Sequence, residues 1–239
     1  MDHCALTRSA GKNLKKTDGS LVERCSGGGR GGSKVVEKPI LFSTEMVRAI
    51  LEGRKMQTRR IVKPQPAGKF LGPEWYKPVV INKDGEEEPG EPVYGIYSED
   101  GEWGIKAHYC PGDILWVQET WFRNDECLLY KASKYENTTA YHGRNGWVQI
   151  KWKPSIHMPR EAARLFLKVT DVRVERLQEI TALGISKEGI TMPSFYGNDI
   201  SPESYLIVKF QDTWQSLYAK RGYPWESNPY VWVIEFEKH

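Results

Sequence analysis

One short stretch, residues 53–60, combines an amine, a hydroxyl and three guanidinium groups in the order Gly-Arg-Lys-Met-Gln-Thr-Arg-Arg. An amine base beside a hydroxyl is one way to activate a weak nucleophile towards a carbonyl carbon. Lys55 is the candidate base and Thr58 the candidate nucleophile, which points to amide hydrolysis. On spacing alone, a glycine that ends a helix, followed by solvated basic residues, accounts for the stretch as well.

The catalytic reading makes two demands. Lys55 acts as a base only if burial or neighbouring cations lower its pKa from about 10 towards neutrality. Lys55 and Thr58 are also three positions apart, and an ideal strand would place them on opposite faces. The two side chains can meet only if the backbone over residues 55–57 forms a turn or an irregular loop.

Periodicity and capping signals predict the elements that would hold this stretch in place. Ser43 or Thr44 is typical of a helix N-cap, and Gly53 of a helix end. Leu206, Phe210, Trp214 and Leu217 recur at helical spacing, which favours a core-facing stripe. The spacing and residue types predict strands over 39–42, 57–62, 114–121, 164–174 and 230–237, and helices over 45–52, 180–188 and 201–221.

The chain of 239 residues is 39% hydrophobic, has nine tryptophans and carries a net charge of +3. The positive charge lies mainly in residues 1–38, which hold eight Lys/Arg against four Asp/Glu, whereas the remainder holds 26 against 27. A body without net positive charge is a poor binder of long nucleic acids. It can still take a single nucleoside, where stacking and hydrogen bonds to base edges dominate.

Composition also predicts the domain organisation. Residues 1–37, with a glycine-rich run, are expected to be a flexible tail before one domain over 38–239. Long polar insertions are expected at about 63–107, as an active-site flap or a decoration, and at about 123–153. Short strands with a few peripheral helices favour an α+β fold, a small mixed β-barrel.

Several classes of protein are disfavoured. The four cysteines are scattered without paired-ligand spacing, so we expect free thiols in a reducing compartment and neither a metal nor a cofactor. No apolar run approaches the roughly 18 residues that span a bilayer, so we expect a cytoplasmic protein without a membrane partner. The pattern does not indicate an oligomeric state.

Taken in order, the motifs resemble a known family. Gly53-x-Lys55-x-x-Thr58-x-Arg60 follows a helix, a Pro-Gly-Asp turn precedes a hydrophobic strand, and Glu188-Gly189-Ile190 precedes the terminal strand. Over residues 39–238 this resembles the ASCH domain of the PUA-like superfamily, closest to the ASCH proteins of bacteriophages and prophages. The resemblance implies a PUA-like barrel and, for a phage-encoded protein, the bacterial host cytoplasm.

The resemblance also implies an activity. Many ASCH domains carry glutamate where this chain has Thr58, and the threonine form is similar to the small ASCH amidohydrolases that remove the acetyl group from N4-acetylcytidine. This implies Lys55, Thr58 and Glu188 as the catalytic group, acting on an N-acylated nucleoside or base. The alternative is a non-catalytic module that binds nucleotides or single-stranded RNA, which a charged Lys55–Glu188 pair would favour.

Further residues are candidates for substrate binding. The arginines beside Lys55 and Thr58 would supply positive charge, and tryptophans could stack on a base, although alternate tryptophans in a strand are more often core residues. A surface ion pair is the alternative for Glu119, and a solvated loop histidine for His157. The candidates are Arg54, Arg59, Arg60, Trp116, Glu119, Trp121, His157 and Arg160.

Overall fold

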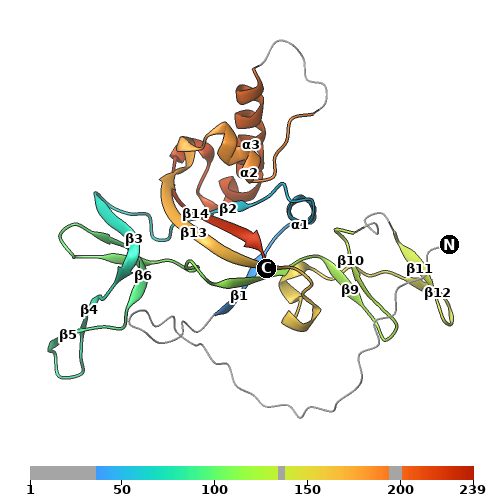
Figure 1. Cartoon of the computed structure of the whole chain (residues 1–239), viewed down its shortest axis with the longest axis horizontal. Coiled ribbons are helices and arrows are strands. Elements are labelled where there is room, and N and C mark those ends of the chain that lie inside the picture. Colours follow the sequence, from blue (N-terminus) through green and yellow to red (C-terminus); the bar gives the residue numbers. More distant parts are fainter. Residues whose placement is uncertain (1–35, 134–137, 194–200) are drawn as a thin grey trace.

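The computed structural model describes residues 36–133, 138–193 and 201–239 (Figure 1). The expected tail falls almost wholly on residues 1–35, which lie outside the described residues, as do Cys4 and Cys25. The first strand begins at Glu37, the last residue of the expected tail. No helix in the described ranges is long and apolar enough to cross a membrane.

A five-stranded sheet forms the centre of the molecule and confirms the predicted strands to within a few residues. The first strand runs parallel to its neighbour, and the other pairings are antiparallel. In spatial order the strands are β1 (Glu37–Leu41), β8 (Ile114–Gln118), β13 (Phe166–Arg176), β14 (Tyr230–Lys238) and β2 (Gln57–Ile61).

The mixed α+β class is confirmed, but the expectation of a closed barrel is not. Among the described strands, β1 pairs with β8 alone and β2 with β14 alone, so the sheet has two free edges. Closure would require these two edges to exchange backbone hydrogen bonds. The Arg60 side chain is the group that reaches across, donating to the Leu41 carbonyl over 2.9 Å.

Three helices lie beside this sheet, with α2 and α3 together at the top of Figure 1. Ser43 caps α1 by accepting from the Met46 backbone N–H, and Thr181 and Ser201 cap the other two in the same way. Pro202 occupies the first helical position of α3, where its missing N–H costs nothing. The helices are α1 (Thr44–Leu51), α2 (Ala182–Lys187) and α3 (Pro202–Tyr218).

Both expected insertions contain strands of their own, on opposite sides of the central sheet in Figure 1. The first holds a three-stranded sheet, β3 (Phe70–Tyr76), β6 (Val93–Ser98) and β7 (Gly104–Lys106), and the hairpin β4 (Val79–Ile81) with β5 (Glu87–Pro89). The region of the second insertion holds two hairpins. The first pairs β9 (Trp121–Arg123) with β10 (Leu128–Tyr130), and the second pairs β11 (Ala140–Gly143) with β12 (Gly146–Gln149). Short 3-10 helices cover Ser155–His157, Arg160–Ala162, Leu177–Glu179, Ala219–Arg221 and Trp225–Ser227.

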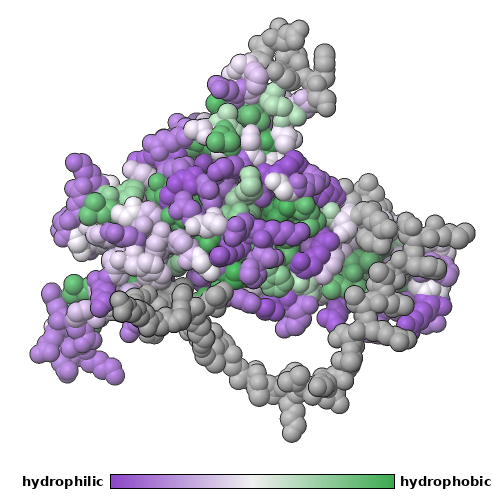
Figure 2. Space-filling model, in the orientation of Figure 1, coloured by the Kyte–Doolittle hydropathy of each residue, from purple (hydrophilic) through white to green (hydrophobic). Residues whose placement is uncertain are grey.

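Hydrophobic side chains cover both faces of strand β14. Trp232 and Ile234 point into the larger core cluster, which the first insertion completes with Tyr94 and Ile96. Val231 and Val233 point to the opposite face and pack in a second cluster with α3. Hydrophilic side chains form broad patches over the middle of the surface drawn in Figure 2. Residues of edge strand β2, of α1 and of α3 lie around one cavity.

A candidate active site at the edge strand

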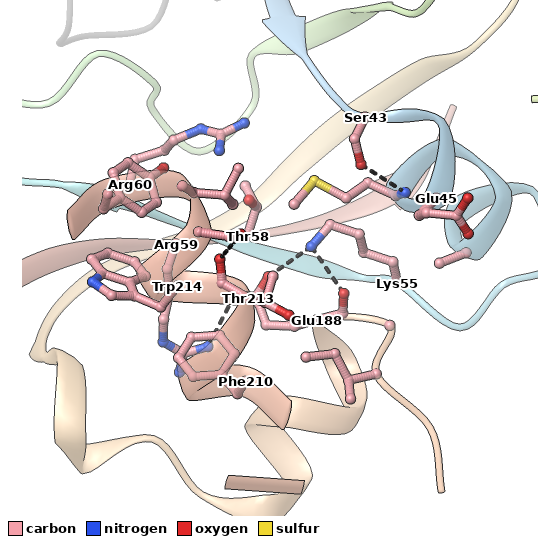
Figure 3. A pocket seen from close by; sticks show the side chains of 17 residues that line it. Ser43, Glu45, Lys55, Thr58, Arg59, Arg60, Glu188, Phe210, Thr213 and Trp214 are labelled. Carbon is pink, nitrogen blue, oxygen red and sulfur yellow. Dashed lines mark hydrogen bonds and ion pairs between the residues drawn. The ribbon is translucent and has the colours of Figure 1, made fainter. Parts of the chain in front are cut away.

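A cavity of about 330 Å³ lies at strand β2, between α1, α3 and the segment that follows α2 (Figure 3). Its volume is at the lower end of the range for small-molecule sites, about 300–1,000 Å³. One part of its wall is charged, and another is aromatic. Its principal side chains are Lys55, Thr58, Arg59, Arg60, Glu188, Phe210, Trp214 and Tyr218, with Ser43, Glu45, Thr213 and Ser216 supplying further polar groups.

Lys55 reaches the cavity because the backbone after α1 turns sharply. Gly53 has φ +74°, a left-handed conformation that suits glycine, and the Lys55 N–H donates to the Ala49 carbonyl over 3.0 Å. Lys55 then forms an isolated antiparallel bridge with Glu188, and β2 begins only at Gln57. Because this stretch of backbone is irregular, the side chains of Lys55 and Thr58 can both border one cavity, which a regular strand would not allow.

The Lys55 ammonium group is buried against a carboxylate. Its side chain has no exposed surface, and its Nζ donates to Glu188 Oε2 over 2.6 Å and to the Glu188 carbonyl over 3.0 Å. Burial lowers the pKa of Lys55, and Arg60 and Arg59 lower it further, while the Glu188 charge opposes the shift. Lys55 is thus easier to deprotonate than an ordinary lysine.

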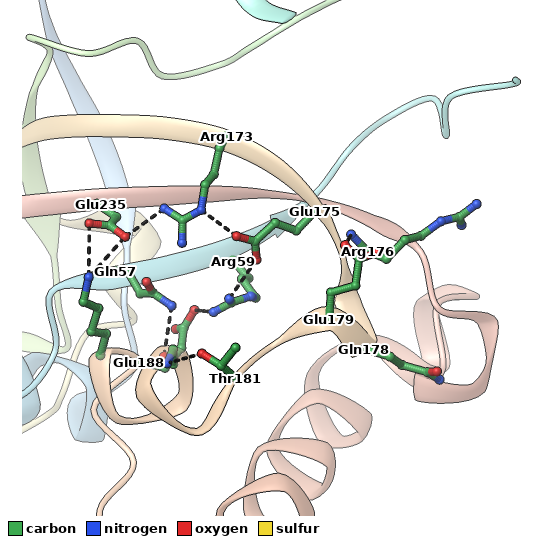
Figure 4. A network of polar contacts seen from close by, with 12 residues as sticks. Gln57, Arg59, Arg173, Glu175, Arg176, Gln178, Glu179, Thr181, Glu188 and Glu235 are labelled. Carbon is green, nitrogen blue, oxygen red and sulfur yellow. Dashed lines mark hydrogen bonds and ion pairs between the residues drawn. The ribbon is translucent and has the colours of Figure 1, made fainter. Parts of the chain in front are cut away.

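Glu188 binds two cations, one at each carboxylate oxygen. Its Oε1 accepts from Arg59 Nη1 over 3.1 Å, and Arg59 Nη2 reaches Glu175 Oε2 over 3.1 Å. Figure 4 shows that this pairing continues into a polar network, in which Arg173 bridges Glu175 and Glu235. The network fixes Arg59, and Arg59 in turn fixes the Glu188 carboxylate beside Lys55.

The segment that holds Glu188 packs closely against Ala49 and Lys55 at Gly189. Gly189 has φ +91°, and a Cβ placed there would lie 2.8 Å from the Ala49 Cβ and 3.0 Å from the Lys55 Cβ. Any side chain at Gly189 would therefore push the bridge between Lys55 and Glu188 apart. Arg54 holds the same turn by donating to the Gly189 carbonyl over 2.6 Å.

Thr58 lies on β2 opposite Ile234 and is 2% exposed. Its hydroxyl makes no hydrogen bond within the described part of the chain, although it borders the same cavity as Lys55 and Glu188. The hydroxyl oxygen does not belong to the fully buried polar atoms that lack a partner, so it keeps some accessible surface in the cavity. An unsatisfied hydroxyl in a charged cavity is therefore available to a ligand.

The structure thus brings together five of the residues that the sequence singles out: Lys55, Thr58, Arg59, Arg60 and Glu188. Arg60 lies at the border of the cavity, with its guanidinium 5.5 Å from the centre of the Phe42 ring. Arg54 does not line the cavity. It pairs with Glu52 and acts on the site only through the Gly189 turn.

Other candidates lie outside this cavity. Glu119 is 1% exposed, and both of its carboxylate oxygens accept from Arg164, over 2.7 and 2.9 Å, so the expected surface pair is instead buried. Trp121 packs in a small core cluster with Met158. Trp116 is on β8, three strands away from β2 in the sheet. None of these three side chains can contact a ligand beside Lys55.

The remaining two candidates are on the surface near the first strand. His157 is exposed in a 3-10 turn, which is the solvated histidine that its loop position also allowed. Arg160 pairs with Glu37 and stacks over Phe166, with 5.3 Å between its guanidinium and the ring centre. Its role in this structure is to hold β1 rather than to line the cavity.

The sequence reasoning missed the aromatic wall of the cavity. Phe210, Trp214 and Tyr218 lie along one side of α3, and Thr213 lies among them. Their helical spacing was visible, but it was interpreted as core alone. In fact Phe210 and Trp214 belong to a core cluster and also border the cavity.

Comparisons of the chain with family models, curated proteins and solved structures found no match. Within the described residues, no group of three or more His, Cys, Asp or Glu side chains converges to hold a metal ion. The site is therefore defined by its own geometry: a buried amine, a hydroxyl without a hydrogen bond in the described residues, a shared carboxylate and an aromatic wall.

Proposed function

We propose that this chain is an ASCH-type, PUA-like amidohydrolase that removes the acyl group from an N-acylated cytidine-type nucleoside or base. The observation that carries the proposal is the meeting of Lys55, Thr58 and Glu188 at one cavity, with the amine buried and the hydroxyl unpaired. These are the three residues that the family resemblance implies. The irregular backbone at Lys55 supplies the arrangement that a regular strand would not.

The residue types support acyl transfer in two halves. Neutral Lys55 takes the Thr58 hydroxyl proton as the oxygen attacks the acyl carbon, and then returns it to the departing amine. Water next attacks the acyl-threonine ester with Lys55 again as base, which releases the acid and restores the hydroxyl. A neutral amine can keep both hydrogen bonds to Glu188 and still leave its lone pair for Thr58.

The charges around Lys55 suit this cycle. Glu188 contacts both Lys55 and Arg59, and Arg59 shares its charge with Glu175 as well. The nearby Arg59 and Arg60 favour the neutral form of Lys55, and Arg60 can stabilise negative charge that develops on the acyl oxygen. Phe210 and Trp214 supply aromatic lining for the base.

A second candidate function is binding without chemistry. It is favoured by the 2.6 Å contact between Lys55 and Glu188, which is the geometry of an ion pair and stabilises protonated lysine. In that case Lys55 and Arg60 are binding groups for a nucleotide or single-stranded RNA, and Thr58 donates a hydrogen bond.

A panel of N4-acylated cytidines separates the two functions. Purified protein is incubated with acetyl, propionyl and benzoyl derivatives, and release of free cytidine is followed by chromatography. The hydrolase proposal expects catalytic turnover of at least one derivative. Saturable binding of these compounds with no cytidine release would support the binding module instead.

A further inference from the structure

A second cavity, of about 280 Å³, lies next to the first and is rich in basic side chains. We call it the basic cavity. Arg60 borders both cavities, so it forms part of the wall between them. The other polar groups of the basic cavity are Lys63, Lys106 and His108, set around Trp232 and Tyr109.

Strand register places Thr58 and Arg60 on the face of β2 that borders the basic cavity, whereas the aromatic wall of the first cavity comes from α3 on the opposite face. Thr58 pairs with Ile234, and Arg60 pairs with Trp232, in the antiparallel pair of β2 and β14. Residues directly opposite one another in such a pair project to the same face. Because Thr58 borders the first cavity and its partner Ile234 borders the second, a ligand held at Thr58 can extend past Arg60 into the basic cavity.

The positive charge of the basic cavity is not compensated. No carboxylate is among its lining residues, and Lys63 and Lys106 make no ion pair within the described ranges. Lys63 instead lies 5.5 Å from the centre of the Tyr223 ring. Clustered like charges repel one another, and a bound anion relieves that repulsion.

His108 adds a hydrogen-bonding group to this charge. Partial burial lowers its pKa, Lys38 and Lys106 lower it further, and Asp113 opposes them. Asp113 is held elsewhere, because it accepts from Lys38 over 2.7 Å and from the Cys110 N–H over 2.8 Å. The cavity therefore offers three permanent cations and an imidazole, a set suited to phosphate oxygens.

We propose that the basic cavity is a phosphate subsite and that the ligand of the first cavity carries a phosphate on its sugar. The nucleoside part of this inference rests on the proposed function, whereas the phosphate part rests on the basic cavity alone. The same chemistry has two sources: the phosphate of a free mononucleotide, or the backbone of a single-stranded RNA.

Calorimetric binding at low salt tests this without any turnover. The ligands are cytidine and its 5′- and 3′-monophosphates, and at least one monophosphate is expected to bind roughly tenfold more tightly than cytidine. In the double variant Lys63→Gln/Lys106→Gln this ratio should fall close to one. The matched control Lys69→Gln/Lys83→Gln removes the same charge from exposed positions outside both cavities, and should keep the ratio.

Three results would overturn the subsite: no monophosphate binds, the wild-type ratio is close to one, or the control loses the ratio as fully as the cavity variant.

A six-nucleotide RNA with a central cytidine then identifies the source of the phosphate. Tighter binding than the mononucleotide, with the same lysine dependence, indicates the RNA backbone, and equal binding indicates a free nucleotide. Acyl release is assayed separately, so a phosphate preference without turnover rejects the hydrolase and keeps the subsite.

Discussion

Two buried glutamates of this protein differ in a way that separates structure from function. Glu119 gives both carboxylate oxygens to a single arginine, Arg164, and borders none of the cavities described above. Glu188 gives one oxygen to Lys55 and the other to Arg59, beside a cavity. The first pair is closed, whereas the second leaves an amine that can exchange its proton with a ligand.

The comparison shows that burial and ion pairing alone do not mark a site. Both carboxylates are nearly inaccessible, with 1% and 8% of their side chains exposed. What distinguishes Glu188 is the cation it binds: a lysine can lose its charge in the folded protein, whereas an arginine cannot. Changing the two glutamates in the same way should therefore have opposite consequences.

Among variants of the ion pairs, the largest effect is expected from Glu188→Gln. Loss of the carboxylate removes the group that orients the Lys55 amine, so release of cytidine should fall by at least about 100-fold. Kinetics on an N4-acylated cytidine measure this, with Glu119→Gln as the matched variant. Equal loss of activity per folded molecule in both variants would remove the distinction between the closed and the open pair.

Next comes Arg164→Met, which leaves Glu119 buried without its partner. An uncompensated buried charge costs about 3–5 kcal/mol, so the free energy of unfolding should fall by roughly 3 kcal/mol in urea titrations. Lys168→Met is the control, because the pair of Lys168 with Glu237 is exposed and 3.9 Å long. It should change stability by less than about 1 kcal/mol. Similar losses in both variants would contradict a closed, structural pair.

The pH dependence follows from the lowered pKa of Lys55. Between that pKa and about 10.4, the value for unfolded lysine, the unfolded state binds more protons, so this residue makes stability rise with pH. Activity should rise as the pH passes through the lowered pKa of Lys55, since the base must be neutral, and should stay on a plateau from there towards about pH 10.4. A kcat/KM profile that falls as the pH rises, or that rises only near about pH 10.4, would contradict Lys55 as a base with a lowered pKa.

A smaller effect is expected from Glu175→Gln. Arg59 loses one of its two carboxylates but keeps Glu188, and the Glu175 side chain is 24% exposed, so solvent screens the lost charge. Stability should fall by no more than about 1 kcal/mol. Cytidine release should fall much less than in Glu188→Gln. A loss as large as in that variant would place Glu175 in the catalytic group itself.

Much of the fold can be read from local signals. The central strands and the three helices follow from capping residues such as Ser43 and Ser201, from Gly53, and from apolar periodicity. Barrel closure cannot be read in this way, because it depends on which edges pair. The first insertion was expected to be a flap or a decoration, yet Tyr94 and Ile96 belong to the main core, and none of its residues lines the first cavity.

The candidate site, like the fold, could be predicted from the sequence only in part. Lys55, Thr58 and Arg60 are near one another in sequence, so spacing marked them as candidates, whereas Glu188 came only from the family resemblance. Trp116 and Glu119 were chosen for residue type on a good strand, but type does not tell how many strands separate them from β2. Periodicity showed that Trp214 is buried, and it could not show that a cavity borders the same face.

The most direct test of the account is the rate of cytidine release by Thr58→Ala. The account predicts a loss of at least about 1,000-fold with an unchanged melting temperature, because the nucleophile is removed while the cavity remains. Thr58→Ser should keep measurable activity, and Thr170→Ala, at an exposed strand position, should keep all of it. Release by Thr58→Ala at the wild-type rate would contradict the nucleophile assignment and, with it, the catalytic account of this cavity.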